Sequence, residues 1–348
     1  MRLFLVDPHD GRLYNDGLFD TSLDPNFIVW QQIRTFLHKK GITIATVDRY
    51  PLNQAERIYF LDHNIFTFKS NGPSHYLQKC ISEDIPKDKL YLVITECPII
   101  KPESWLPENH EHYGTIYTWN DSLIDNKKYF HYRWIQNLNG TLEDLPSFSA
   151  KKLLTLINAH KTNYNPNELY SLRIKAIRFY EKHYPDDFDL YGIGWDKPLN
   201  IKFVYSVLKG NFMKVPKFMQ DFVLSYIGYP SYQGSVEDKI STLSKYKFCL
   251  CFENMENIDG YITEKIFDSL KAGCVPIYLG AQNIQKYIPT EAFIDFRNFS
   301  GFEDLTKYLL SMKEEEYNNY IDARNSFLKK GTEQWDYKHF AEDIFLHE

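Results

Sequence analysis

Residues 252–280 read FENMENIDGYITEKIFDSLKAGCVPIYLG, and this stretch guides the interpretation of the whole chain. Its order of apolar and polar runs predicts a strand, a polar loop, a helix and a second strand. Polar side chains crowd the loop after the first strand, which is where parallel sheets bind ligands. Gly260 in that loop permits close backbone approach.

The start of the predicted helix carries the first candidate chemistry. Thr263, Glu264 and Lys265 stand in its first turn. Free N–H groups at a helix N-terminus, together with the Lys265 ammonium, form an anion site that suits a diphosphate. An ordinary helix cap beside a solvated Glu and Lys explains the same residues, so spacing alone leaves both interpretations open.

Outward from this segment, strands and helices alternate along the chain. This alternation implies parallel sheets and doubly wound domains. Two such series predict an α/β fold of two Rossmann-like domains that face a central cleft, divided into residues 1–150 and 151–348. The expected strands lie at 2–7, 42–48, 58–62, 91–95, 115–119, 152–158, 188–194, 247–254, 274–280 and 292–296, and the expected helices at 25–40, 73–82, 167–183, 236–246, 262–272 and from 300 onward.

The composition excludes several classes of protein. The 348 residues are 43% hydrophobic and 25% charged, which is typical of a globular protein and not of a disordered, collagenous or small disulfide-rich one. Lys and Arg number 40 against 46 Asp and Glu, a formal net charge of −6. This balance gives no global attraction for nucleic acid, so a bound phosphate must meet a local cation.

The five cysteines form no CxxC pair and predict buried, reduced thiols. Cys249 and Cys251 would share one face of a strand. Half of a metal site is the alternative, although no second ligand pair follows at zinc spacing. No apolar run approaches the 18 residues of a membrane span, and Asp7 comes too early for a signal peptide, so we expect a cytoplasmic protein.

The quoted stretch resembles the donor-binding signature of the α-1,3-fucosyltransferase family, glycosyltransferase family 10, in its bacterial form. The resemblance rests on FEN (252–254), DGYITEK (259–265) and KAGCVPIYLG (271–280), with AFIDFRNF (292–299) further on. Gly260 is a departure, because it lengthens the gap between the FEN and YITEK elements by one residue. The resemblance implies a GT-B fold, GDP-β-L-fucose as donor, inversion at the anomeric carbon, and no cofactor or catalytic metal.

The same resemblance implies roles for residues of the second half. Asn254, Tyr261, Glu264 and Lys265 would line the nucleotide-sugar site. Lys265 would bind the pyrophosphate. Glu264 would hold a sugar hydroxyl or stabilise positive charge that develops at the fucose ring. The strand DLYG would end at Gly192, where a missing side chain lets the donor approach the backbone.

An arginine upstream completes the expected donor site. The family has a strand, a loop with Asn, and an Arg that opens a helix, and here KLLTLINAH (152–160) precedes LRIKAIRFYE (172–181). Arg173 aligns best with that Arg, and Arg178 is the alternative. A guanidinium can bind two phosphate oxygens at once and neutralise a departing GDP.

A carboxylate of the first half is expected to act as the base. The sequence TECP (95–98) follows the strand YLVIT, and the family places a Glu after the corresponding strand. Glu96 therefore resembles the general base, with Glu103 as the fallback. A carboxylate beside a dry cleft can have its pKa raised toward the useful range.

The sequence thus predicts an inverting fucosyltransferase. Residues 1–150 would bind a glycan that contains N-acetylglucosamine, residues 151–348 with the C-terminal helices would bind the donor, and an α-1,3 or α-1,4 linkage would result. Use of another GDP-sugar and a non-catalytic glycan-binding protein are the alternatives. A metal-dependent transferase would use an Asp-x-Asp motif such as Asp187-Phe188-Asp189. Peripheral contact with the inner membrane stays open, because lipid-linked glycans are plausible acceptors.

Overall fold

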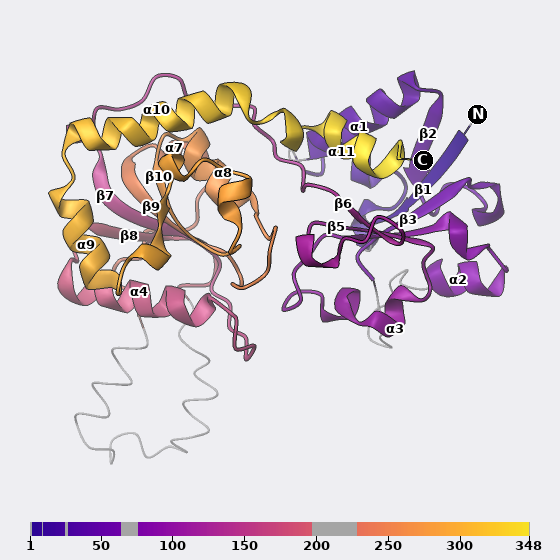
Figure 1. The fold of residues 1–348 in the computed structure, drawn as a ribbon, viewed down its shortest axis with the longest axis horizontal. Helices are drawn as coiled ribbons and strands as arrows, with labels where there is room; N and C mark the ends of the chain where they lie inside the picture. Colours follow the sequence, from indigo (N-terminus) through magenta and orange to yellow (C-terminus); the bar gives the residue numbers. More distant parts are fainter. Residues whose placement is uncertain (1, 9, 25–26, 64–75, 197–227, 348) are drawn as a thin grey trace, which may run out of the picture.

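The computed structural model describes residues 2–8, 10–24, 27–63, 76–196 and 228–347. They form two sheets that lie side by side, and every strand pair within each sheet is parallel (Figure 1). The first sheet has the order β2-β1-β3-β4-β5-β6 and the second has the order β11-β10-β9-β7-β8. The strands are β1 Arg2–Asp7, β2 Ile42–Thr46, β3 Arg57–Leu61, β4 Leu90–Ile94, β5 Thr115–Thr118, β6 Tyr129–His131, β7 Lys152–Ile157, β8 Phe188–Tyr191, β9 Tyr246–Phe252, β10 Val275–Leu279 and β11 Ile294–Asp295.

The predicted α/β fold with two doubly wound parallel sheets is confirmed. Strand β6 was not predicted, because its three residues lie in a polar region without a clear pattern. The α-helices are α1 Ile28–Lys39, α2 Tyr76–Ser82, α3 Pro107–His110, α4 Tyr170–His183, α7 Lys239–Leu243, α8 Glu264–Lys271, α9 Phe302–Ser311, α10 Glu314–Lys330 and α11 Tyr337–Phe345.

Two helix predictions need comment. The helix expected at 236–246 is shorter, because Asp238 is its N-cap and accepts a hydrogen bond from the Ser241 amide at 3.0 Å. The helix expected at 73–82 is α2, which begins at Tyr76, and the positions before it lie outside the described residues.

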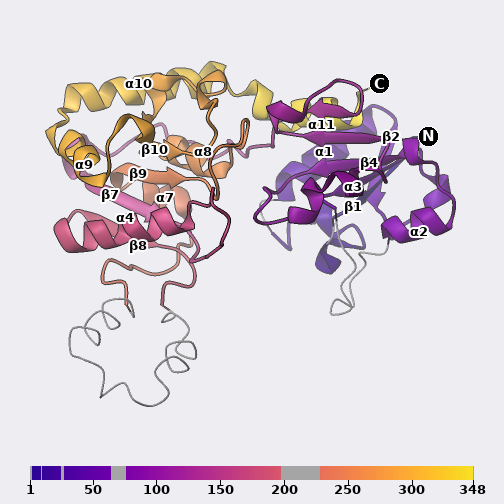
Figure 2. The same cartoon turned by 60° about the horizontal axis from the view of Figure 1, so that its bottom comes forward.

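The second sheet is covered on both faces, which explains why its strands are apolar throughout. Successive side chains of a strand point to opposite faces. Phe248 and Leu250 of β9 lie in one hydrophobic cluster with Ile177 of α4. Cys249 and Cys251 lie in another cluster, which includes the buried face of α8. Helix α4 therefore covers one face and α8 the other, as the turned view indicates (Figure 2).

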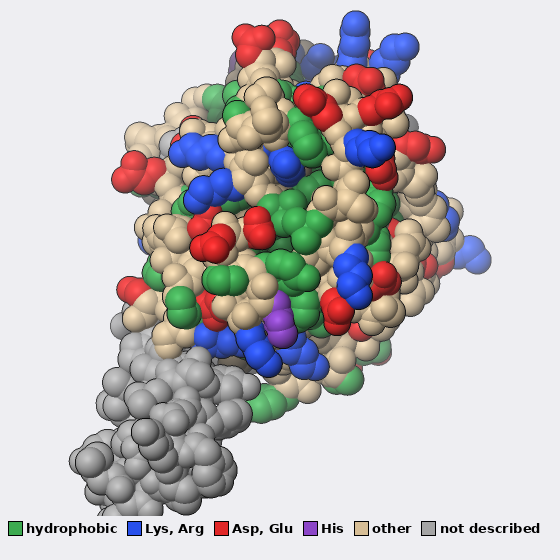
Figure 3. All heavy atoms as spheres, turned by 90° about the vertical axis from the view of Figure 1, so that its left-hand side faces the viewer, with side chains coloured by type: hydrophobic (Ala, Val, Ile, Leu, Met, Phe, Trp, Pro, Cys, Tyr) green, Lys and Arg blue, Asp and Glu red, His purple; other side chains and the backbone are tan. Residues whose placement is uncertain are grey.

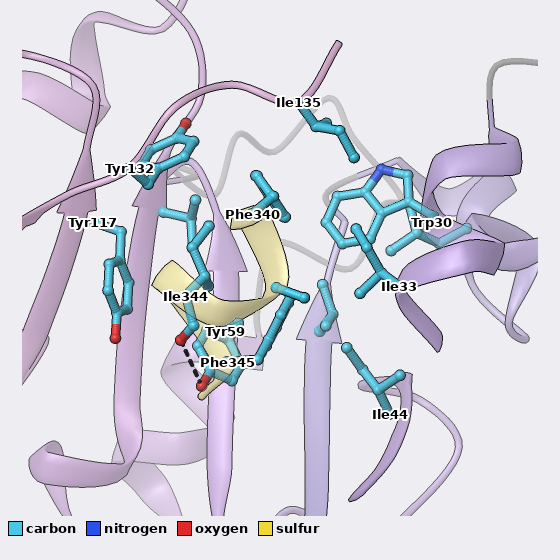
Figure 4. Packing of buried hydrophobic residues seen from close by; sticks show 14 of the residues in the cluster. Trp30, Ile33, Ile44, Tyr59, Tyr117, Tyr132, Ile135, Phe340, Ile344 and Phe345 are labelled. Carbon is cyan, nitrogen blue, oxygen red and sulfur yellow. Dashed lines mark hydrogen bonds between the residues drawn. The ribbon is translucent and has the colours of Figure 1, made fainter. Parts of the chain in front are cut away.

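The C-terminal helix α11 returns to the first sheet (Figure 1). Phe340 and Phe345 pack among Trp30 and Ile33 of α1 and Tyr59 of β3 (Figure 4). The Tyr59 hydroxyl donates a hydrogen bond to the carbonyl of residue 344 at 3.2 Å. The prediction placed all C-terminal helices with the second domain, whereas the apolar face of α11 is buried against the first. The division near residue 150 stays a prediction.

The face of the second domain that Figure 3 shows has hydrophobic side chains near its centre, with Lys, Arg, Asp and Glu around them. Both signs of charge occur across this face, so it does not carry a field of one sign. Among the helices described, none combines the length and the apolar character that crossing a bilayer requires.

Candidate active site

A cavity of about 440 Å³ opens between the two sheets at the carboxyl ends of their strands. Glu96 and Trp119, which follow β4 and β5, reach it from the first sheet. Loops after β7, β8 and β9 contribute most of the other wall. The predicted site residues Glu96, Arg173, Gly192, Asn254, Tyr261, Glu264 and Lys265 all line this one cavity. Their chemical roles stay predictions.

Lys265 is held in place by a buried carboxylate. Its Nζ lies 3.2 Å from Glu253 Oε2 and donates to Thr263 Oγ1 at 2.9 Å. Glu253 is completely buried and also accepts hydrogen bonds from the amide and the hydroxyl of Thr263, at 2.8 and 2.7 Å. Burial acts to lower the pKa of Lys265, but the attraction of Glu253 and Glu264 outweighs it, and the net shift is upward.

The same contacts modify the predicted anion site. The N-terminus of α8 was expected to offer free amides to a phosphate. The Thr263 amide instead donates to Glu253, so a carboxylate of the chain already occupies part of that position. The Lys265 ammonium lines the cavity and is the cation that α8 presents to it.

Glu264 has the opposite environment to Glu253. Its side chain is 53% exposed and lies 3.7 Å from the Lys265 ammonium. Burial would raise the pKa of Glu264, but the charges of Lys265 and Lys239 outweigh that effect and lower it to about 2. Glu264 is therefore a stable anion that faces the cavity, which suits a partner for a hydroxyl or for developing positive charge.

The choice between the two arginines follows from their positions. Arg173, in the first turn of α4, is 2% exposed, and its Nη2 donates to the carbonyls of residues 252 and 253 at 2.6 and 2.5 Å. Burial lowers the pKa of Arg173. Among the described residues its Nε has no hydrogen-bond partner. Arg178 instead pairs with Glu181 at 2.7 Å and does not line the cavity.

Asn254 and Tyr261 connect Arg173 to the domain interface. The Asn254 side chain accepts a hydrogen bond from Arg173 Nη2 and donates one to the Tyr261 hydroxyl, both at 3.2 Å. Tyr261 is 3% exposed, and its ring lies 4.8 Å from that of Trp119 in the first domain. Tyr261 therefore supports the wall of the cavity more than it presents a surface to it.

Gly192 lines the cavity, and the structure gives a further reason for its lack of a side chain. Its backbone has φ +129°, and a Cβ atom there would overlap the carbonyl of Asn158. The residue is therefore glycine because β7 and β8 end in close contact.

Glu96 differs from the other charged groups of the site. Within the described residues its carboxylate makes no hydrogen bond and no ion pair with another side chain. Burial, reinforced by the neighbouring Asp62 carboxylate, raises the pKa of Glu96 above its usual range. The fallback Glu103 lies on a 3-10 helix over Pro102–Trp105 and does not line the cavity.

The position of Glu96 is fixed through its backbone. Asp62 is 3% exposed and accepts hydrogen bonds from the amides of Thr95 and Glu96, at 3.0 and 3.3 Å, and from the Thr95 hydroxyl. Trp105 donates to the Glu96 carbonyl at 3.0 Å, and Trp119 to the Thr95 carbonyl at 3.1 Å. These contacts hold the end of β4 while the carboxylate stays unpaired.

The alternative Asp-x-Asp motif lies away from the cavity. Asp189 is in β8 and binds the Lys152 ammonium at 2.7 Å and the Tyr246 hydroxyl at 2.6 Å. Within the described ranges no three His, Cys, Asp or Glu side chains come together as a metal site. All five cysteines are buried and free, as predicted for reduced thiols, and Cys249 and Cys251 share one face of β9 and line the cavity.

Sequence reasoning missed several residues of the site. Lys161 is exposed and lines the cavity. Its positive charge partly offsets the upward shift in the pKa of Glu96. Lys239 also lines it and pairs with Asp268 at 2.8 Å. Glu253 comes directly after a buried strand, and this position was a signal that it lies at the carboxyl edge of the sheet, although not that it is buried. Trp119 at the end of β5 carried a similar signal.

Whole-chain similarity to solved structures defines the class of fold. A crystal structure of an alpha1,3-fucosyltransferase with GDP matches with a TM-score of 0.53 and 14% identity over 97% of this chain and 87% of that chain. The Anabaena protein HepE in complex with UDP and glucose matches with a TM-score of 0.54 and 10% identity over 99% and 98%. At these identities the likeness shows the fold alone, which is that of GT-B glycosyltransferases.

The sequence comparisons then show similarity to one family over the C-terminal part of the chain. Residues 208–345 match the family model described as glycosyltransferase family 10 (fucosyltransferase), C-terminal part. The Helicobacter pylori alpha-(1,3)-fucosyltransferase FucT is 41% identical over 91 residues, which are 25% of this chain and 18% of that protein. Human alpha-(1,3)-fucosyltransferase 4 is 37% identical over 102 residues, 28% of this chain and 19% of that protein. The predicted resemblance to family 10 is confirmed, and the matched part spans about a fifth of these curated relatives.

Proposed function

We propose that this protein transfers L-fucose from GDP-β-L-fucose to a hydroxyl of a glycan that contains N-acetylglucosamine, with inversion, to give an α-1,3 or α-1,4 linkage. The observation that carries the proposal is that one cavity is lined by a carboxylate from the first domain and by cations from the second. Glu96, a carboxylate with a raised pKa and no side-chain partner among the described residues, enters from the first domain, and the cations Arg173 and Lys265 enter from the second. The names of the curated relatives support the choice of reaction.

The proposed reaction is a single displacement. The Glu96 carboxylate takes the proton of the acceptor hydroxyl as that oxygen bonds to the anomeric carbon of fucose. The bond from that carbon to the β-phosphate oxygen breaks, and GDP leaves with the electron pair. Lys265 and Arg173 stabilise the charge on the leaving diphosphate, and Glu264 faces the positive charge that develops on the sugar ring.

We propose that turnover needs no metal ion, because side-chain cations are available for the diphosphate. Lys161 and Lys239 add two ammonium groups to those of the predicted site. The expected result is equal turnover in EDTA and in excess Mg²⁺. Loss of turnover in EDTA that Mg²⁺ restores would contradict this part of the proposal. Cytoplasmic location and peripheral contact with a membrane stay proposals that cell fractionation can test.

The donor is tested by calorimetric binding of GDP-fucose, GDP-mannose and UDP-galactose without metal, on the unaltered protein and on Lys265→Ala. We expect selective binding of GDP-fucose that is weakened in the variant by about 2 kcal/mol, the value of a charge-assisted contact. Equal binding of GDP-mannose would favour another GDP-sugar as donor. Binding of donor without transfer to any acceptor of this class would favour the non-catalytic alternative.

A further inference from the structure

The inserted glycine of the DGYITEK element lies at the contact between the two domains. Gly260 has φ +78°, a conformation that favours glycine. A Cβ atom at this position would overlap the carbonyl oxygen of Trp119, which follows β5 in the first sheet. The loop between β9 and α8, residues 253–263, is named the donor loop. It therefore touches the backbone of the first domain at a point where no side chain fits.

A group of polar side chains crosses the interface beside this contact. The Gly260 amide donates to Asn283 Oδ1 at 2.9 Å. Asn283 is 6% exposed, and its Nδ2 donates to Asp121 Oδ2 of the first domain at 2.5 Å. The Tyr287 hydroxyl donates to the same carboxylate oxygen at 2.5 Å, and His131 Nε2 lies 3.3 Å from the other oxygen.

The contact continues to both sides of the cavity. On the donor side, Tyr261 follows Gly260 directly, packs on the Trp119 ring and binds Asn254. On the acceptor side, the Trp119 indole donates to the Thr95 carbonyl, one residue before Glu96. One residue, Trp119, thus touches the donor loop through its carbonyl and ring, and the strand end of the expected base through its indole.

We propose that Gly260, Asn283 and Asp121 form an interdomain clamp that positions the donor loop against Trp119. The clamp thereby fixes the position of Glu96 relative to the cations Lys265 and Arg173. They are positioning residues. The inserted residue gives the loop the length to reach Trp119, and its missing side chain lets the two backbones meet. The catalytic part of this inference rests on the proposed function, whereas the clamp itself does not.

Gly260→Ala tests the clamp, and Gly41→Ala is its matched control. Gly41 has φ +77°, so both variants carry the same backbone strain, but a Cβ atom at Gly41 meets no atom within 4 Å. We expect Gly260→Ala to lower kcat for transfer on the order of 10- to 100-fold relative to Gly41→Ala, because reacting groups are misplaced. The Kd for GDP should stay within about threefold, because the diphosphate contacts lie within one domain.

The rate of cysteine alkylation tests the clamp without a measurement of enzyme activity. Cys97 is fully buried in the cluster that contains Trp119 and Tyr261, and Cys80 is fully buried in a separate cluster of the first domain. We expect Gly260→Ala to accelerate alkylation of Cys97, read by peptide mass spectrometry, and to leave Cys80 unchanged. Gly41→Ala should accelerate neither thiol.

The outcomes separate the two proposals. If the unaltered protein transfers no fucose, the proposed function fails and the alkylation rates alone decide the clamp. Alkylation of Cys97 at the rate of the control overturns the clamp, and so does a loss of GDP binding in proportion to kcat, which would mark a defect of the donor loop alone. If Gly260→Ala does not fold, Asn283→Ala removes the bridging amide without adding an atom, and the same two results apply.

Discussion

The two walls of the cavity hold their charges in different ways. On the wall of the second domain, Lys265 is bound to Glu253 and Arg173 is bound to backbone carbonyls. On the wall of the first domain, Asp62 fixes the backbone at Glu96 but the Glu96 carboxylate itself stays unpaired within the described residues. In the proposed mechanism the cations stay charged, and they are paired in advance, whereas Glu96 exchanges a proton and has a raised pKa. The first prediction tests this difference directly.

The largest effect is expected for Glu96→Gln. This change keeps the shape of the side chain but removes the base, so transfer should fall about 1,000-fold, within the range of general-base catalysis. GDP binding should stay unchanged, because the diphosphate contacts are on the other wall. Initial rates with saturating donor give the measurement, and Glu103→Gln is the control that should retain activity. Retention of near-normal transfer by Glu96→Gln would mean that another group is the base.

The next largest effect is expected for Arg173, on the cavity wall formed by the second domain. Arg173→Ala should reduce kcat/KM about 100-fold, because a preorganised cation for the leaving group is lost. Arg178→Ala removes an arginine five residues further along α4 that does not line the cavity, and should change kcat/KM by less than about threefold. Thermal unfolding of both variants separates lost folding from lost chemistry. A larger loss in Arg178→Ala would reverse the assignment.

A stability measurement compares two carboxylates that both contact Lys265. Glu253 is fully buried, so Glu253→Ala leaves a nearly buried ammonium without its partner and should lower the free energy of unfolding by about 3 kcal/mol. Glu264 is half exposed, and Glu264→Ala should cost less than about 1 kcal/mol. Urea unfolding of the two variants gives both values. Equal losses would show that the Glu253 pair is not a structural anchor.

The smallest effect concerns pH. The pKa of Glu96 is raised by burial and by Asp62, so the acidic limb of kcat/KM should lie above the usual carboxyl range, with activity rising as Glu96 loses its proton. Asp62→Asn keeps an oxygen acceptor for the amides of residues 95 and 96 but removes the negative charge. The pKa of Glu96 then falls, and the limb should move to lower pH by on the order of half a pH unit. A limb that stays in place or moves to higher pH would contradict this coupling.

Much of the site could be predicted because its residues are near one another in sequence or follow strands. Glu264 and Lys265 are adjacent, and Glu96 and Asn254 each lie two residues beyond the end of a buried strand. Parallel strands deliver such residues to one edge of a sheet, so position along the chain was sufficient. The partner of Lys265 was missed because a carboxylate after a strand looks the same whether it is solvated or buried.

The sequence alone determined the alternation of strands and helices, the fold class and the family signature, since these depend on periodicity and on residues within about one supersecondary unit. Only the tertiary structure decided that Gly260 meets Trp119, that Asn283 binds Asp121, and that α11 packs on the first sheet. Each of these contacts joins residues far apart in the chain. Their geometry depends on how the two sheets are oriented relative to each other. Local sequence patterns do not predict that orientation.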